Sequence, residues 1–226
     1  KSSKAFIALD FPAPDIPVTR TILFSIIPHP FHKLYQQLNL STILTIILTG
    51  GPLMKPCIFL DIDGVINPNR KSTTYHFDYS LPNTLAKKLN HPKIANLNVY
   101  LVNQVYSCFS KESINYLKQL IEKYNAQIII TSSWRIVYSL DQLQTMFDIF
   151  GLGKYIKATT PLISPRTKAI QEFINEHNIT SYVILDDFDM SNIFDYHFIY
   201  VRNYFNEQDF KKANYALFIQ ERKPSI

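Results

Sequence analysis

Cysteine is scarce in this sequence, and its scarcity bears on where the protein works. Only two cysteines, Cys57 and Cys108, occur among the 226 residues, and they lie far apart. This spacing matches neither a zinc-binding pattern nor a framework of disulfides. The sequence therefore favours a reducing compartment, the cytoplasm, over secretion, and both cysteines are expected to be small buried hydrophobic residues.

Long apolar runs and dense basic tracts are also missing. The longest apolar stretch near the start, residues 43–48, is far shorter than the roughly 20 residues that a membrane-spanning helix needs. We therefore expect no membrane span. The formal net charge is +5, but lysine and arginine are scattered among acidic residues. A mildly positive protein favours an anionic substrate, and nucleic acid is one class of anion that fits it.

Glutamate is absent from the first 53 residues, which also hold six of the 13 prolines. Their apolar patches follow no clear period, and a Gly50-Gly51 pair separates them from Met54. We expect translation to begin at Met54, so that residues 1–53 are upstream sequence or a poorly ordered extension. A signal peptide is the competing interpretation, but a basic start of the usual form and a small-residue cleavage site are lacking. The folded domain is expected to span residues 54–226.

From residue 56 onward, short apolar runs alternate with segments of helical period. Hydrophobic residues make up 46% of the chain, enough to bury a sizeable core. The alternation predicts βαβ units, and hence an α/β fold with a mainly parallel sheet. Strands are predicted at residues 57–60, 127–131, 182–185 and 197–201. Helices are predicted at residues 111–124, 140–150, 164–177 and 206–220.

Residues 67–109, between the first strand and its crossover helix, are the least regular part of the domain. A strand is predicted within them at residues 99–106. Open α/β sheets bind ligands beyond the carboxyl ends of their strands, and an insertion after the first strand would overhang that edge. We expect this insertion to form a small cap or flap.

Chemically active side chains follow the predicted strands, where a parallel sheet gathers them at one edge. They are Asp61 and Asp63 after the first strand, Thr131 and Ser132 after the second, Asp186 and Asp187 after the third, and Arg166 and Lys168 at a helix start. Crowded carboxylates repel each other unless a cation lies among them, and oxygen ligands without His or Cys suit Mg²⁺. Hydroxyl and cationic side chains complement a bound phosphate. The set therefore predicts a Mg²⁺ site beside a phosphate site.

The order of these residues resembles the haloacid-dehalogenase (HAD) superfamily. The first HAD motif is similar to Asp61-x-Asp63-Gly64-Val65 after an apolar strand, where Gly64 lets the chain turn sharply. The remaining motifs are matched in order by Ser132 or, less well, Thr131; by Lys168 or Arg166, with a slight preference for Lys168; and by Asp186-Asp187. Together with Thr-Ser-Ser-Trp-Arg at residues 131–135, the pattern most resembles the HAD domains of RNA-repair (Swiss Army Knife) proteins. The resemblance covers about residues 56–220 and implies a Rossmann-like, three-layer α/β/α sandwich.

The resemblance also implies a phosphatase that works through an aspartyl-phosphate. Asp61 would attack phosphorus, and Asp63 would protonate the leaving oxygen and then activate water. Mg²⁺ would be held by the Asp61 carboxylate, the Asp63 backbone carbonyl and Asp186, with Asp187 as an alternative or outer ligand. The expected substrate is a nucleotide or a nucleic-acid terminal phosphate. A sugar phosphate and a non-catalytic binding module are the alternatives, and the oligomeric state stays open.

Two residues beside the second motif have open interpretations. Trp134 is expected to be a packing residue rather than a platform on which a base stacks. Arg135 is equally compatible with binding a substrate phosphate and with pairing to a local carboxylate.

Overall fold

The computed structural model describes residues 55–69 and 76–221 of the chain. The predicted N-terminal extension, residues 1–53, lies outside the described residues. None of the helices within the described ranges combines the length and the apolar composition that crossing a bilayer requires.

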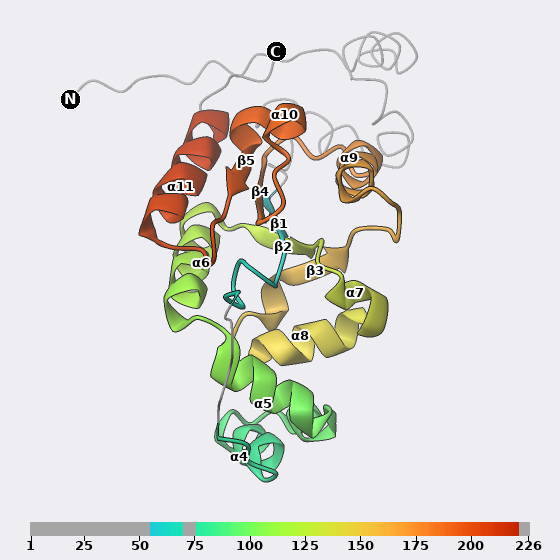
Figure 1. The fold of residues 1–226 in the computed structure, drawn as a ribbon, viewed down its shortest axis with the longest axis vertical. Helices are drawn as coiled ribbons and strands as arrows, with labels where there is room; N and C mark the ends of the chain where they lie inside the picture. Colours follow the sequence, from blue (N-terminus) through green and yellow to red (C-terminus); the bar gives the residue numbers. More distant parts are fainter. Residues whose placement is uncertain (1–54, 70–75, 222–226) are drawn as a thin grey trace, which may run out of the picture. The chain divides into compact units, whose positions relative to one another are not determined.

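A parallel sheet of five strands, in the order β3-β2-β1-β4-β5, forms the centre of the described domain (Figure 1). The strands are β1 (Cys57–Leu60), β2 (Gln127–Ile130), β3 (Ile156–Thr159), β4 (Tyr182–Asp186) and β5 (Phe198–Tyr200). The central strand β1 pairs with β2 and β4 in the same register, so that Leu60 lies opposite both Ile130 and Leu185. Residues that directly follow these three positions are thereby brought to one edge of the sheet.

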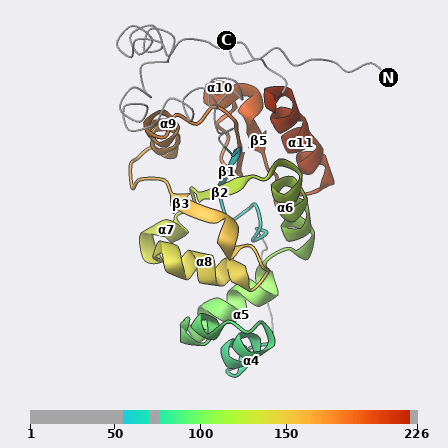
Figure 2. The same cartoon turned by 180° about the vertical axis from the view of Figure 1, so that it is seen from behind.

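Helices cover both faces of this sheet, as Figures 1 and 2 show. Side chains alternate along β1, so Ile58 and Leu60 pack on one face, and Cys57 and Phe59 pack on the other. The first face is covered by α6 (Lys111–Tyr124), α8 (Leu140–Asp148) and α11 (Glu207–Glu221). The second face is covered by α9 (Arg166–Glu176) and α10 (Ser191–Phe194). The predicted three-layer α/β/α sandwich is therefore confirmed.

The helices on the first face begin where the sequence supplies a cap. The Ser110 hydroxyl accepts a hydrogen bond from the Ser113 N–H at the start of α6, and Asn125, which caps the other end of α6, has a left-handed φ of 50°. Ser139 and Gln142 form a capping box at the start of α8. These side chains satisfy N–H groups that the first helical turn leaves without a backbone partner. Both helices therefore begin at the predicted residues.

The sequence does not predict β3, which is an edge strand. Only Ile156 among its four residues is fully buried, and β3 pairs with β2 on one side of the sheet. A strand at the edge needs no continuous apolar run, whereas the strands at the centre are buried on both faces. The signal that identifies β1, β2 and β4 is therefore missing from β3.

The insertion after β1 is mainly helical where the structure describes it. It contains α4 (Leu81–Lys88), the 3-10 helix η2 (Pro92–Asn96) and α5 (Val99–Cys108). The strand predicted at residues 99–106 is therefore wrong. The Asn98 side chain accepts hydrogen bonds from the N–H groups of Tyr100 and Leu101, which starts a helix. Valine and tyrosine, which strands favour, misled the prediction.

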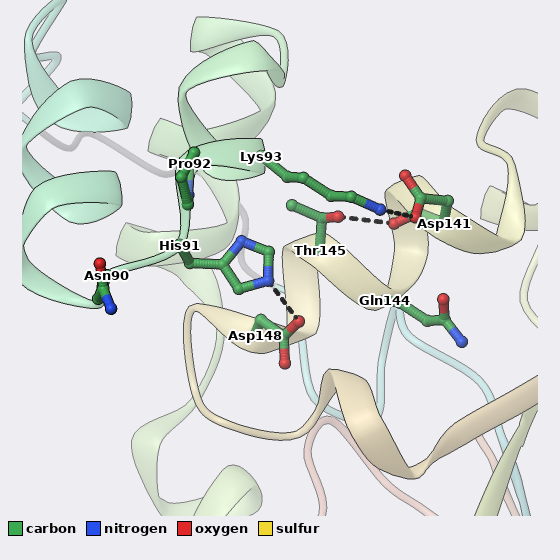
Figure 3. Close-up of a pocket in the computed structure, with 8 residues that line it drawn as sticks. All are labelled: Asn90, His91, Pro92, Lys93, Asp141, Gln144, Thr145 and Asp148. Atoms are coloured by element: carbon green, nitrogen blue, oxygen red, sulfur yellow. Dashed lines mark hydrogen bonds and ion pairs between the residues drawn. The ribbon is translucent and has the colours of Figure 1, made fainter.

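The insertion is anchored to α8: α5 lies next to α8 in Figures 1 and 2, and α4 lies beyond α5. Figure 3 shows the contact: His91 Nε2 lies 3.0 Å from Asp148 Oδ2, and Lys93 pairs with Asp141. At the end of the insertion, the ring of Phe109 packs against two aromatic rings in and just after α8. The insertion is therefore packed on the domain, and its role as a cap or flap stays a prediction.

Candidate active site

Three carboxylates meet at the carboxyl edge of the sheet. Asp61 follows β1, Asp186 ends β4, and Asp187 comes next, and one oxygen of each lies within 4.8 Å of the others. The side chains of Asp61 and Asp186 are buried, and that of Asp187 is half-buried. Such a concentration of negative charge away from water calls for a cation. The cluster can hold a metal ion through oxygen ligands alone.

Burial and mutual repulsion disfavour the charged forms of these carboxylates. Burial raises the pKa of Asp61 above its ordinary value, although the Arg166 charge opposes the shift. Burial, followed by the negative charge of Asp61, raises the pKa of Asp186 to about 6. The two groups therefore take up protons more readily in the fold than in the unfolded chain.

Arg166, the first residue of α9, supplies positive charge to the cluster. Its Nη1 lies 2.9 Å from Asp61 Oδ2 and 2.6 Å from Asp186 Oδ2. Burial alone would lower the pKa of Arg166, but the charges of the two carboxylates raise it above its ordinary value. Arg166 therefore stays charged and partly neutralises the site.

Lys168 lies elsewhere on the same helix. Its Nζ is 3.7 Å from Glu172, one turn along α9, and its side chain is 60% exposed. The slight sequence preference for Lys168 over Arg166 is therefore not supported by where the two side chains lie. The structure brings Arg166, rather than Lys168, to Asp61 and Asp186.

Gly64 makes room for Asp187. The Asp187 Oδ2 accepts a hydrogen bond from Asn69 Nδ2 at 3.0 Å, next to the backbone of Gly64. A Cβ atom at Gly64 would lie only 2.1 Å from that oxygen, and the φ of Gly64 is +76°. Glycine is therefore required twice here, for the left-handed turn and for the close approach of the carboxylate.

Replacing Gly64 with alanine is expected to damage both the fold and the carboxylate cluster. The left-handed φ costs a side-chain-bearing residue about 1–2 kcal/mol, and the displaced Asp187 should weaken metal binding by about 10-fold or more. Gly151→Ala is the matched control, because Gly151 has a φ of +72° but nothing within 4 Å of an added Cβ. Thermal unfolding of both variants measures the loss of stability, and metal titration measures the loss of metal affinity. An equal effect of the two substitutions on metal affinity would contradict the role of Gly64 beside Asp187.

Asp63 lies beside the cluster but is not a member of it. Its Oδ2 accepts a hydrogen bond from Trp134 Nε1 at 2.7 Å, and its Oδ1 accepts one from Asn67 Nδ2 at 2.7 Å. The side chain is half-buried, so it remains open to solvent on one side. Asp61 and Asp63 therefore sit in different surroundings, one buried among charges and one held by neutral donors.

The two hydroxyls after β2 are fully buried. Ser132 forms a hydrogen bond with the Asp61 carboxylate, which opposes the rise in the pKa of Asp61. The hydroxyl of Thr131 has no hydrogen-bond partner among the described residues. Ser132 is therefore in direct contact with the carboxylate cluster, and Thr131 is a neighbouring donor that a ligand could use.

Arg135 fits neither of its two sequence interpretations. Its guanidinium donates to the backbone carbonyls of Thr131, Ser132 and Thr160. Burial is the main cause that lowers its pKa below the ordinary value, and the Arg166 charge adds to this. Arg135 therefore joins the loop after β2 to the loop after β3 and holds the backbone on which Ser132 stands.

The geometry thus gathers a carboxylate cluster, a cation and a hydroxyl at one sheet edge, in the positions that the four HAD motifs occupy along the chain. The family profile of the HAD domain in Swiss Army Knife RNA repair proteins matches residues 57–210. The chain belongs to this HAD family. No curated protein and no solved structure matches the chain. The HAD resemblance read from the sequence, including its RNA-repair branch, is confirmed at the level of the family.

The HAD match spans every strand of the sheet and every residue proposed for the site. Of the predicted residues, the structure brings Asp61, Asp186, Asp187, Arg166 and Ser132 into one cluster of contacts. Lys168 is outside this cluster, and the side chains of Asp63 and Thr131 lie at its border.

Sequence reasoning missed three residues that hold the HAD carboxylates in place. Trp134 and Asn67 donate to Asp63, and Asn69 donates to Asp187. The expected packing of Trp134 is also present, because its ring lies 5.9 Å from that of Phe109. The one signal in the sequence was that Asn67 and Asn69 come shortly after the first motif. Nothing in the sequence showed which polar group they would meet.

Proposed function

We propose that the chain is a Mg²⁺-dependent phosphatase that forms an aspartyl-phosphate on Asp61 and acts on a nucleotide or a nucleic-acid terminal phosphate. The observation that carries this proposal is the buried cluster of Asp61, Asp186 and Asp187 with Arg166 bonded to two of its members. A fold that only bound a partner would gain nothing from two carboxylates whose charged forms are disfavoured by burial. Membership of the HAD family supports phosphoryl chemistry.

The reaction proceeds in two displacements at phosphorus. An Asp61 oxygen forms a bond to phosphorus while the bond to the leaving oxygen breaks, and Asp63 gives that oxygen its proton. Water then attacks the aspartyl-phosphate, Asp63 takes a proton from the water, and the bond between phosphorus and Asp61 breaks to release phosphate. Arg166 and Ser132 offset negative charge on the phosphoryl oxygens in both steps.

The donor set fits Mg²⁺, because oxygen atoms of Asp61, Asp186 and Asp187 converge and no sulfur or imidazole lies among them. These three carboxylates, together with the backbone carbonyl of Asp63, would hold the ion. When bound, Mg²⁺ supplies positive charge that lets an anionic nucleophile approach an anionic phosphate.

Mg²⁺ should stabilise the protein strongly above pH 6 and weakly below it. The pKa of Asp186 is raised from 3.8 to about 6 in the fold, so the metal-free protein loses stability as the pH rises between these two values and stays at the lower level above pH 6. Metal binding needs the ionised carboxylate, and its ionised fraction falls about 10-fold for each pH unit below the pKa. We expect Mg²⁺ to raise the unfolding temperature clearly at pH 7.5 and much less at pH 5.

Thermal unfolding with and without Mg²⁺ at the two pH values measures this effect, and Asp186→Asn is the control. The variant should show no Mg²⁺-dependent rise at either pH, because the titrating ligand has been removed. A rise of the same size at both pH values in the wild type would mean that Asp186 is not a ligand.

Phosphate release tests the proposed function directly. Wild type and Asp61→Asn are incubated with Mg²⁺ and with nucleotides, sugar phosphates, and 3′- or 5′-phosphorylated oligonucleotides. We expect the wild type to release phosphate fastest from nucleotides or oligonucleotide ends, and the variant to release none. A preference for sugar phosphates would move the substrate to small metabolites. Absence of release from every substrate by folded, Mg²⁺-loaded protein would overturn the phosphatase and favour a binding module.

A further inference from the structure

We infer that Trp134 is a positioning residue whose indole N–H holds the Asp63 carboxyl group in the orientation from which it protonates the leaving group. The inference rests on the proposed function, in which Asp63 is the proton donor. It assigns to Trp134 a part in the reaction beyond packing, although Trp134 itself would touch neither the phosphate nor the metal.

Both oxygens of the Asp63 carboxylate are engaged, but by donors of different character. Trp134 Nε1 lies 2.7 Å from Oδ2, and Asn67 Nδ2 lies 2.7 Å from Oδ1. An indole nitrogen can only donate, whereas an amide side chain carries a donor and an acceptor and can turn over. The bond from Trp134 therefore has one direction only, and Oδ2 accepts it. Together with the bond from Asn67 to Oδ1, it fixes the orientation of the Asp63 carboxyl group.

The indole is itself held in place by contacts with its neighbours. Its ring lies 5.9 Å from that of Phe109 at the end of the insertion and 5.7 Å from that of Tyr138. Trp134 also stands two residues after Ser132, whose Oγ lies 3.5 Å from the Trp134 backbone nitrogen. The same loop thus supplies a hydroxyl to Asp61 and an N–H to Asp63. The proton donor and the phosphoryl-binding hydroxyl therefore keep a fixed relation, which proton transfer in a transition state requires.

A packing role and a positioning role of Trp134 predict different kinetics. Loss of packing lowers the fraction of enzyme whose active site is correctly folded. The rates on all substrates should then fall by the same factor. Loss of the N–H leaves the nucleophile in place but misdirects the proton, so it slows only those substrates whose leaving group needs protonation. An alkoxide needs the proton far more than a nitrophenolate does.

The test compares benzyl phosphate with 4-nitrophenyl phosphate, two esters of similar size, in the full chain with Mg²⁺. Trp134→Phe keeps an aromatic ring and removes the N–H, and Phe109→Leu loosens the packing around Trp134 while keeping the N–H. The quantity measured is kcat/KM, which covers the steps through departure of the leaving group. We expect Trp134→Phe to lose about 10-fold more activity on benzyl phosphate than on 4-nitrophenyl phosphate. Phe109→Leu should change the two by the same factor.

A second measurement detects the hydrogen bond without turnover. Trp134 is the single tryptophan of the chain, so one indole N–H signal in a nitrogen-15 NMR spectrum reports on it. Asp63→Asn should shift this signal, and Asp141→Asn, an exposed substitution on α8, should leave it in place.

The outcomes separate the inference from the proposed function. The inference is overturned if Trp134→Phe loses the same factor in kcat/KM on both esters, or if the indole signal does not shift in Asp63→Asn. Neither result contradicts the proposed phosphatase activity. Failure of the wild type to release phosphate from these esters and from every screened substrate overturns the proposed function, and the inference falls with it. A larger loss on benzyl phosphate than on 4-nitrophenyl phosphate, together with a shifted indole signal, establishes the positioning role of Trp134.

Discussion

Asp61→Asn is expected to abolish phosphate release and yet leave the metal-free protein at least as stable as the wild type. The nucleophile is lost, so activity should fall on the order of 10³-fold or more. Stability should not fall, because burial raises the pKa of Asp61 despite its bonds to Ser132 and Arg166. The ionised side chain therefore costs the fold free energy at neutral pH, and the amide removes that cost.

Two measurements check this opposition between activity and stability. Phosphate release is followed with Mg²⁺, and thermal unfolding is followed at pH 7.5 after the metal has been chelated. Asp141→Asn is the control, since Asp141 is 64% exposed on α8 and, among the described residues, pairs with an exposed lysine alone. It should change neither quantity noticeably. Activity of Asp61→Asn close to that of the wild type would place the nucleophile elsewhere.

The second large effect is expected from Arg166, with Lys168 as its matched control two residues away. Arg166→Met keeps a side chain of similar length but removes the charge that contacts Asp61 and Asp186. We expect a loss of about 10²–10³-fold in kcat/KM, the size seen when a group that stabilises transition-state charge is removed. Lys168→Met should stay within about 2-fold, because Lys168 forms only an exposed pair with Glu172.

The pH dependence of stability adds a second readout to this pair. Without Arg166 the two buried carboxylates have lost their cation, so metal-free Arg166→Met should be less stable than the wild type at pH 7.5. At pH 5 the difference should shrink, because protonation of Asp186, whose pKa is raised to about 6, relieves the repulsion. Equal kinetic losses in the two variants would contradict the assignment of the third HAD motif to Arg166.

The centre of the fold and the carboxylates could be predicted from the sequence, because they carry strong local signals. Strands β1, β2 and β4 are buried on both faces, and the acidic residues stand directly at the ends of β1 and β4. The edge strand β3 and the helix α5 were not predicted. Burial on one face leaves little apolar signal in β3, and the strand-like composition of α5 is overruled by an asparagine cap and by packing.

The finer parts of the site depend on directions that a sequence does not contain. Arg166 and Lys168 both lie in the first turn of α9, and only the orientation of that helix decides which side chain reaches the carboxylates. The bond from Trp134 to Asp63 joins residues 71 positions apart. Neither a motif nor a period could show that the indole N–H would meet a carboxylate rather than solvent.

The position of β1 at the middle of the sheet has a consequence for how the protein is made. The strand that precedes the proposed nucleophile is the first of the five to leave the ribosome, but its neighbour β4 pairs with it only from Tyr182 onward. Until then one edge of an entirely apolar strand has no partner, which is a state prone to association with other chains. The proposed metal ligands Asp186 and Asp187 stand at the end of this same strand, β4. Closing the sheet and completing the proposed metal site are therefore one late event, and we expect an incomplete chain to be inert towards phosphate esters.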